Sequence, residues 1–143
     1  MKPIWMSAEH VRKMNEKLEV APQVLEACSR LASDAVIAWR FQDEDTGEVI
    51  WWQMLFSRES GVRFALGEPS APAGVTFASG YWAFVEHAFA KGEKPALEME
   101  TLGDAGLIEV TREAFEAALA VAAVPIERPV RARGSQVAGS KQA

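Results

Sequence analysis

Residues 74–119 read GVTFASGYWAFVEHAFAKGEKPALEMETLGDAGLIEVTREAFEAAL, and elements of alternating type follow one another within them. Residues 74–78 alternate in the manner of a strand, and Ser79-Gly80 interrupts the alternation. The next ten residues place Trp82, Val85 and Phe89 three and four positions apart. This spacing predicts a helix with a wide apolar face, which needs a cover from the rest of the chain.

A glycine and a proline within residues 91–95 end this predicted helix, because glycine adopts positive φ readily and proline cannot continue helical hydrogen bonding. Residues 96–101 then alternate, with Leu97 and Met99 on one side and glutamates on the other. This alternation predicts a second strand that is covered on one face only.

Residues 103–106 form the next predicted turn, and a final helix follows. That helix carries Phe115 and Leu119 on its apolar side. Thr111 is its predicted N-cap, because a threonine oxygen can accept from the free N–H groups of the first turn.

Three further strands are predicted upstream, over residues 35–41, 49–56 and 62–66. Two helical pieces precede them, the first capped by Ser7 and the second starting at Pro22. The predicted fold class is therefore α+β. It contains about five strands in a largely antiparallel sheet, covered by N-terminal, central and C-terminal helices.

This order of elements resembles the sterol carrier protein 2-like, or SCP2-like, lipid-binding family. Gly92 matches the glycine between the central helix and the following strand of that family, and Gly103-Asp104 matches its Gly-Asp turn. The meander between Ala35 and Leu66 also has a counterpart there, so the resemblance extends from about Ser7 onward. Lys94-Pro95 and the long tail after Pro129 depart from the pattern of the family.

The resemblance implies non-catalytic binding or carriage of an apolar ligand in a cavity between sheet and helices. The ligand would be a fatty acyl chain, a sterol-like molecule or another lipid, and no cofactor or metal is expected. Nine apolar residues are the expected wall of the cavity: Trp52, Phe77, Trp82, Val85, Phe89, Leu97, Met99, Phe115 and Leu119.

The composition of the whole chain supports one small domain. The chain has 143 residues, 49% of them hydrophobic, with a net charge of −5. We expect one domain over residues 1–129 and a basic, disordered tail over residues 130–143. The absence of a clustered basic face argues against nucleic acid binding, and no stretch is long enough for stable membrane insertion. A single cysteine, Cys28, and the lack of an apolar leader favour a cytoplasmic protein.

Two alternatives remain open at this stage. The first is a protein-interaction or oligomerisation module with a filled core, in which Trp52 or its neighbours lie in a subunit interface of a homodimer. The second is a small enzyme that uses His87 with Glu86 or Asp104 as acid and base. The acidic run Asp43–Glu48 is predicted to be a hairpin turn, because the glutamate that would close a calcium loop is replaced by Met54.

Overall fold

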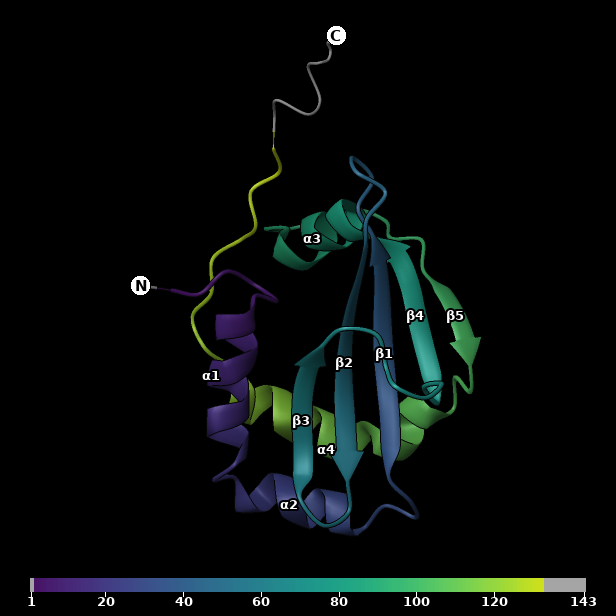
Figure 1. Cartoon of the computed structure of the whole chain (residues 1–143). Helices are drawn as coiled ribbons and strands as arrows, with labels where there is room; N and C mark the ends of the chain where they lie inside the picture. The colour runs from purple at the N-terminus through teal and green to yellow at the C-terminus, as the bar shows by residue number, and fades with distance from the viewer. Residues whose placement is uncertain (1, 133–143) are drawn as a thin grey trace, which may run out of the picture.

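The structure, a computed structural model of the whole chain, describes residues 2–132 and contains one five-stranded sheet with four helices (Figure 1). The helices are α1 (Ala8–Leu18), α2 (Pro22–Ser29), α3 (Tyr81–Phe89) and α4 (Leu107–Ala122). The strands are β1 (Ala35–Gln42), β2 (Val49–Ser57), β3 (Gly61–Leu66), β4 (Val75–Gly80) and β5 (Glu100–Gly103). This architecture confirms the predicted α+β fold class.

The strand order across the sheet is β3-β2-β1-β4-β5. β1 and β4 run parallel, and the other three pairs of neighbouring strands are antiparallel, as predicted for a largely antiparallel sheet. Trp39 of β1 lies opposite Trp52 of β2 on one side and Phe77 of β4 on the other. Because residues that are directly paired share one face of a sheet, these three rings form a row across its centre.

The two faces of the sheet have different covers. α4 passes behind the strands in Figure 1, whereas the connection between β3 and β4 crosses in front of them. Ile37, Trp39 and Phe41 of β1 are buried, and they point toward the helices. On the opposite face, Gln53 is buried under the connection and donates a hydrogen bond to the carbonyl of Gly67 (3.0 Å).

The two N-terminal helices begin as predicted. The Ser7 hydroxyl accepts from the backbone N–H of His10 (3.2 Å), and Pro22 occupies the first turn of α2. Asn15 of α1 also binds β3, because its side chain accepts from the N–H of Phe64 (2.8 Å) and donates to the carbonyl of the same residue (2.9 Å). The backbone N–H and C=O of Phe64 at this sheet edge are therefore satisfied within the chain.

The last strand lies further along the chain than the sequence predicts. β5 begins at Glu100, so Leu97 and Met99 precede it. The N–H of Asp104 donates to the carbonyl of Gly74 (2.9 Å), which fixes the register in which Gly103 faces Val75. From that point β5 pairs with β4 over four residues, the last pair being Ala78 with Glu100.

The last helix begins earlier than predicted, and Thr111 is not its N-cap. α4 starts at Leu107, because the Asp104 carboxylate accepts from the N–H of Gly106 (2.9 Å) and turns the chain there. Thr111 is fully buried in the helix interior, where its hydroxyl donates to the carbonyl of Leu107 (2.8 Å). This hydrogen bond satisfies a buried hydroxyl that would otherwise oppose folding.

Candidate functional site

The structure brings six of the nine expected wall residues into one apolar interior. Val85 is fully buried and Trp52 is 8% exposed, while the other four are half-buried and pack against the same core. These four are Phe77, Trp82, Phe89 and Phe115. Leu97 and Met99 are half-buried before β5 and lie outside this core, and Leu119 is 46% exposed on α4.

One group of rings joins the centre of the sheet to α4. The ring centre of Trp39 lies 4.7 Å from that of Trp52, 6.0 Å from Phe77 and 6.2 Å from Phe115. Trp52 in turn stacks on Phe64 of β3, with ring centres 5.4 Å apart and ring planes 7° from parallel. We call these rings the Trp39 cluster. Three of the expected wall residues, Trp52, Phe77 and Phe115, therefore meet around Trp39, which is not among the nine expected ones.

A second group of rings surrounds Trp5, which lies on the segment before α1. Trp5 is 9% exposed, although it belongs to no helix or strand. Its ring centre is within 6.3 Å of five other rings: Phe41, Trp52, Tyr81, Phe84 and Phe89. We call this group the Trp5 cluster, and Trp52 connects it to the Trp39 cluster.

Trp5 is not among the nine expected wall residues, because its segment carries no periodic pattern. Its one local signal is position, since Trp5 and Met6 directly precede the capping Ser7. Apolar residues before an N-cap often pack against the protein interior and fix the direction in which the chain enters the helix.

Few hydrogen bonds hold the segment that carries Trp5. Glu127 donates its N–H to the carbonyl of Pro3 (2.8 Å) and accepts from the N–H of Trp5 (3.0 Å). The N–H of Met6 donates to Nδ1 of His10 (2.9 Å). Met6 has a φ of 65°, the one positive φ of a non-glycine residue among residues 2–132. Such a backbone conformation is sterically unfavourable for a side chain of this size.

Two indole N–H groups in this interior have no hydrogen-bond partner. They are Nε1 of Trp52 and Nε1 of Trp82, and both atoms are buried. A buried donor without a partner costs about 1–3 kcal/mol. The apolar interior therefore contains polar groups that an acceptor atom would stabilise.

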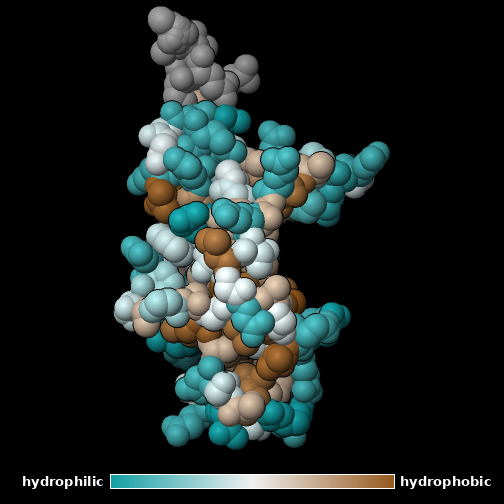
Figure 2. All heavy atoms as spheres, turned by 90° about the vertical axis from the view of Figure 1, so that its right-hand side faces the viewer, coloured by the Kyte–Doolittle hydropathy of each residue, from teal (hydrophilic) through white to brown (hydrophobic). Residues whose placement is uncertain are grey.

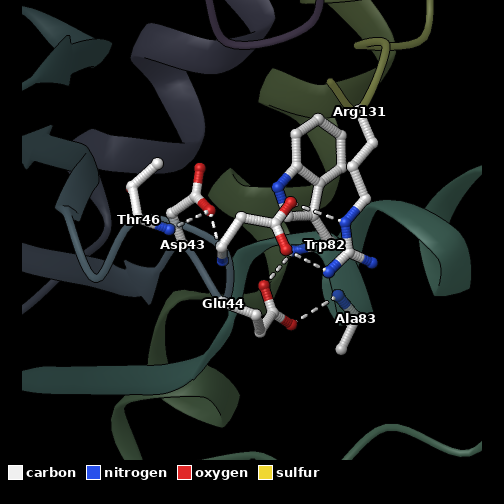
Figure 3. A network of polar contacts seen from close by, with 7 residues as sticks. Asp43, Glu44, Thr46, Trp82, Ala83 and Arg131 are labelled. Atoms are coloured by element: carbon white, nitrogen blue, oxygen red, sulfur yellow. Dashed lines mark hydrogen bonds and ion pairs between the residues drawn. The ribbon is translucent and has the colours of Figure 1, made fainter. Parts of the chain in front are cut away.

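The N-terminus of α3 is capped from a distant part of the chain. The Glu44 carboxylate, in the turn between β1 and β2, accepts from the backbone N–H of Trp82 (2.8 Å) and of Ala83 (3.0 Å) (Figure 3). A carboxylate here satisfies free donors of the first turn and is favoured by the helix dipole. The acidic run is a hairpin turn as predicted, and it also positions α3.

Arg131 binds the same turn from the C-terminal side. Its guanidinium donates two hydrogen bonds to the Asp45 carboxylate (2.7 and 2.6 Å) and lies 5.8 Å from the ring centre of Trp82 (Figure 3). The hydrogen bond from Arg131 lowers the pKa of Asp45 from its ordinary value. Arg131 belongs to the region predicted to be a disordered tail; the remainder of that tail, residues 133–143, lies outside the described residues.

His87 is held by backbone groups. Its Nδ1 donates to the carbonyl of Pro95 (2.9 Å), and Lys94 donates to the carbonyl of His87 (3.0 Å). Among the described residues no hydrogen bond or ion pair joins His87 to Glu86 or Asp104. The acid and base pair of the enzyme alternative is thus not assembled in this structure.

The surface pockets lie away from the two ring clusters. A groove of about 910 Å³ lies between the N-terminal segment, α1 and residues 124–127. A second pocket, of about 640 Å³, lies at the turn between β1 and β2. Neither is lined by any of the nine expected wall residues. Rings fill the space between the sheet and α3.

Solved structures show which fold this is. The chain resembles the crystal structure of sterol carrier protein 2, with a TM-score of 0.54 and 15% identity, over 82% of this chain and 96% of that one. It also resembles a conserved hypothetical protein of Thermus thermophilus, described in the words "possibly sterol carrier protein", with a TM-score of 0.53 and 14% identity over 87% and 95% of the two chains. No family model and no curated protein matches the chain.

These likenesses confirm that the fold is SCP2-like. At such low identities they concern the fold alone, because one fold commonly serves unrelated functions. No helix among residues 2–132 is long and apolar enough to cross a membrane.

Proposed function

We propose that this protein binds or carries an apolar ligand, without catalysis, between its sheet and α3 and α4. The observation that supports the proposal most is the continuous layer of rings formed by the Trp5 and Trp39 clusters. The SCP2-like fold supports it further, because one similar solved protein is named sterol carrier protein 2 and the other is described in the words "possibly sterol carrier protein". A fatty acyl chain, a sterol-like molecule or another lipid is the ligand class, and the cytoplasm is the expected location.

Apolar burial would supply most of the affinity of this site. Each square ångström of apolar surface removed from water contributes roughly 25 cal/mol, so a ligand of lipid size gains several kcal/mol from contact area alone. The buried rings offer such contacts, and the two unpaired indole N–H groups offer polar ones. The layer must open to admit the ligand, because side chains fill it in this structure.

The proposal can be tested with cis-parinaric acid, a fatty acid whose fluorescence rises when it leaves water. Phe89→Asp places a charge among the rings of the Trp5 cluster, and we expect it to raise the Kd at least tenfold. Glu116→Ala, an exposed change on α4, is the matched control and should leave the Kd within about twofold.

Both variants must show native circular dichroism for the comparison to count. If folded Phe89→Asp binds as well as Glu116→Ala, the ligand does not lie against the Trp5 cluster. If wild type gives no fluorescence rise with cis-parinaric acid at any concentration below its solubility limit, a fatty acyl ligand is excluded.

The filled interior also favours a second candidate, an interaction or oligomerisation module. Trp52 itself packs inside the subunit, so it is not free to enter an interface. Its neighbour Trp51 is half-buried on the opposite face of the sheet and is the better interface residue. A molar mass that doubles with concentration in light scattering, and that Trp51→Ser restores to the monomer value, would support this candidate.

A further inference from the structure

We propose that the Trp5 cluster is the ligand subsite itself, that Trp5 occupies it in the empty protein, and that the ligand is a fused planar ring carrying an oxygen acceptor. This inference rests on the proposed function and specifies where the ligand binds and to which chemical class it belongs. Trp5 is an internal substitute for the ligand and leaves when the ligand binds.

The geometry around Trp5 describes what fits in the subsite. Phe84 lies nearly parallel to the Trp5 indole, with ring centres 5.7 Å apart and planes at 13°. Phe89 and Trp52 present their rings at steep angles of 84° and 64°. Parallel and edge-on contacts of this kind are the favourable geometries between aromatic rings. A flat fused ring reproduces all of them, whereas a flexible acyl chain reproduces none.

The unpaired N–H of Trp52 indicates the polar part of the ligand. Trp52 is more than nine-tenths buried, its ring centre lies 6.3 Å from that of Trp5, and its Nε1 has no partner. The indole of Trp5 cannot satisfy this donor, because an indole N–H only donates. A ring with a hydroxyl or carbonyl oxygen would accept the hydrogen bond and would hold an advantage over Trp5.

The segment that carries Trp5 is held weakly enough for the ligand to replace the Trp5 side chain. The residue belongs to no helix or strand, and its segment is held by a short bridge to Glu127 and by the bond from Met6 to His10. The positive φ of Met6 lies directly beside Trp5. Release of the segment relieves that unfavourable conformation, while α1 can keep its own cap at Ser7.

The test uses protein labelled with 5-fluorotryptophan and titrated with 2-naphthol, a fused planar ring with one hydroxyl. Fluorine NMR reports each of the five tryptophans separately, with assignments from single Trp→Phe variants. We expect the Trp5 signal to move toward the value of free fluorotryptophan and the Trp52 signal to shift. The signal of Trp51, on the other face of the sheet, is the internal control and should stay unchanged.

Two variants separate the parts of the inference. Trp5→Ala removes the internal competitor, so the Kd for 2-naphthol should fall by about tenfold or more. We expect wild type to prefer 2-naphthol over naphthalene, and Trp52→Phe, which keeps a ring and removes the donor, should abolish that preference. Titration of wild type does not depend on either variant folding.

Different results would contradict the subsite, its ligand class and the proposed function. If cis-parinaric acid binds while saturating 2-naphthol leaves the Trp5 signal unchanged, the proposed function stands and this subsite is wrong. If cis-parinaric acid displaces Trp5 and 2-naphthol does not, the subsite stands and its ligand class is wrong. If no apolar probe binds wild type or folded Trp5→Ala, the proposed function fails with it.

Discussion

Trp52 combines dense packing with an unsatisfied hydrogen-bond donor. Adjacent residues of a strand point to opposite faces of a sheet, and in the structure Trp52 is buried while Trp51 is half-exposed on the other side. The missing partner of the Trp52 N–H was beyond prediction, because it depends on rings from segments far apart in the chain. The sequence pattern predicts which face of the sheet a side chain points to. Only the folded structure shows which other side chains it contacts there.

His10 gives a prediction at the same scale. Nδ1 of His10 accepts the hydrogen bond of Met6, so the ring must be neutral with its proton on Nε2. Burial lowers the pKa of His10 below 6.5, its ordinary value. Between the folded and unfolded pKa values the unfolded chain binds more protons, so the free energy of unfolding falls as pH drops below about 6.5.

We therefore expect wild type to lose stability in urea between pH 7.5 and pH 5, and His10→Gln to lose less over the same range. Glutamine keeps an oxygen that can accept from Met6 and does not titrate. Equal losses in wild type and His10→Gln would show that this bond does not carry the pH dependence.

At the scale of elements, α3 depends on a side chain outside it. The sequence predicts this helix from its apolar spacing, with an end one residue from the observed one. It does not predict the cap, because Glu44 lies in a turn that is distant in sequence and close only after β1 and β4 have paired. The same limit explains the register of β5 and the start of α4, which follow from contacts of Asp104 with Gly74 and Gly106.

Removing this cap should weaken the fold measurably. Glu44→Ala should lower the free energy of unfolding in urea by about 1 kcal/mol, the usual effect of losing an N-cap. Gly80→Ala should act through the same contact, because an added Cβ would collide with the Glu44 carboxylate. The double variant should then be no less stable than the worse single variant, since both changes remove one interaction.

Glu48→Ala is the control, since Glu48 lies in the same turn and its hydrogen bonds there are made by its backbone. If Glu48→Ala lowers the free energy of unfolding as much as Glu44→Ala does, the effect comes from the negative charge of the turn and not from the cap. Strictly additive losses in the double variant would mean that Gly80 and Glu44 act independently.

For the whole molecule, the sequence predicts the fold class and most elements, and it does not predict the strand order. Alternation or a nearly continuous apolar run marks each strand, yet the parallel pairing of β1 with β4 depends on the path of residues 67–74 across the sheet. Six expected wall residues meet in one interior because strand and helix periodicity identifies core faces. The three that do not, Leu97, Met99 and Leu119, lie where the observed elements differ in extent or orientation from the predicted ones.

Large apolar side chains are exposed at several places on the surface of the molecule. On the side that carries β5, apolar residues appear in several places among hydrophilic ones (Figure 2). Leu102 of β5 is one exposed apolar residue, and Val110 and Leu119 of α4 are others. Isolated exposed residues of this kind are normal for a protein surface, so the buried ring layer remains the feature that needs a functional explanation.

The most direct measurement of the proposed function is native mass spectrometry of the full chain after incubation with lipid extract from the expression host, followed by solvent extraction of the denatured protein. We predict a recurring adduct of small-molecule mass that disappears on denaturation and is recovered in the extract. A bare monomer or dimer, with nothing recovered from protein that is folded by circular dichroism, would contradict apolar ligand binding and favour the interaction module.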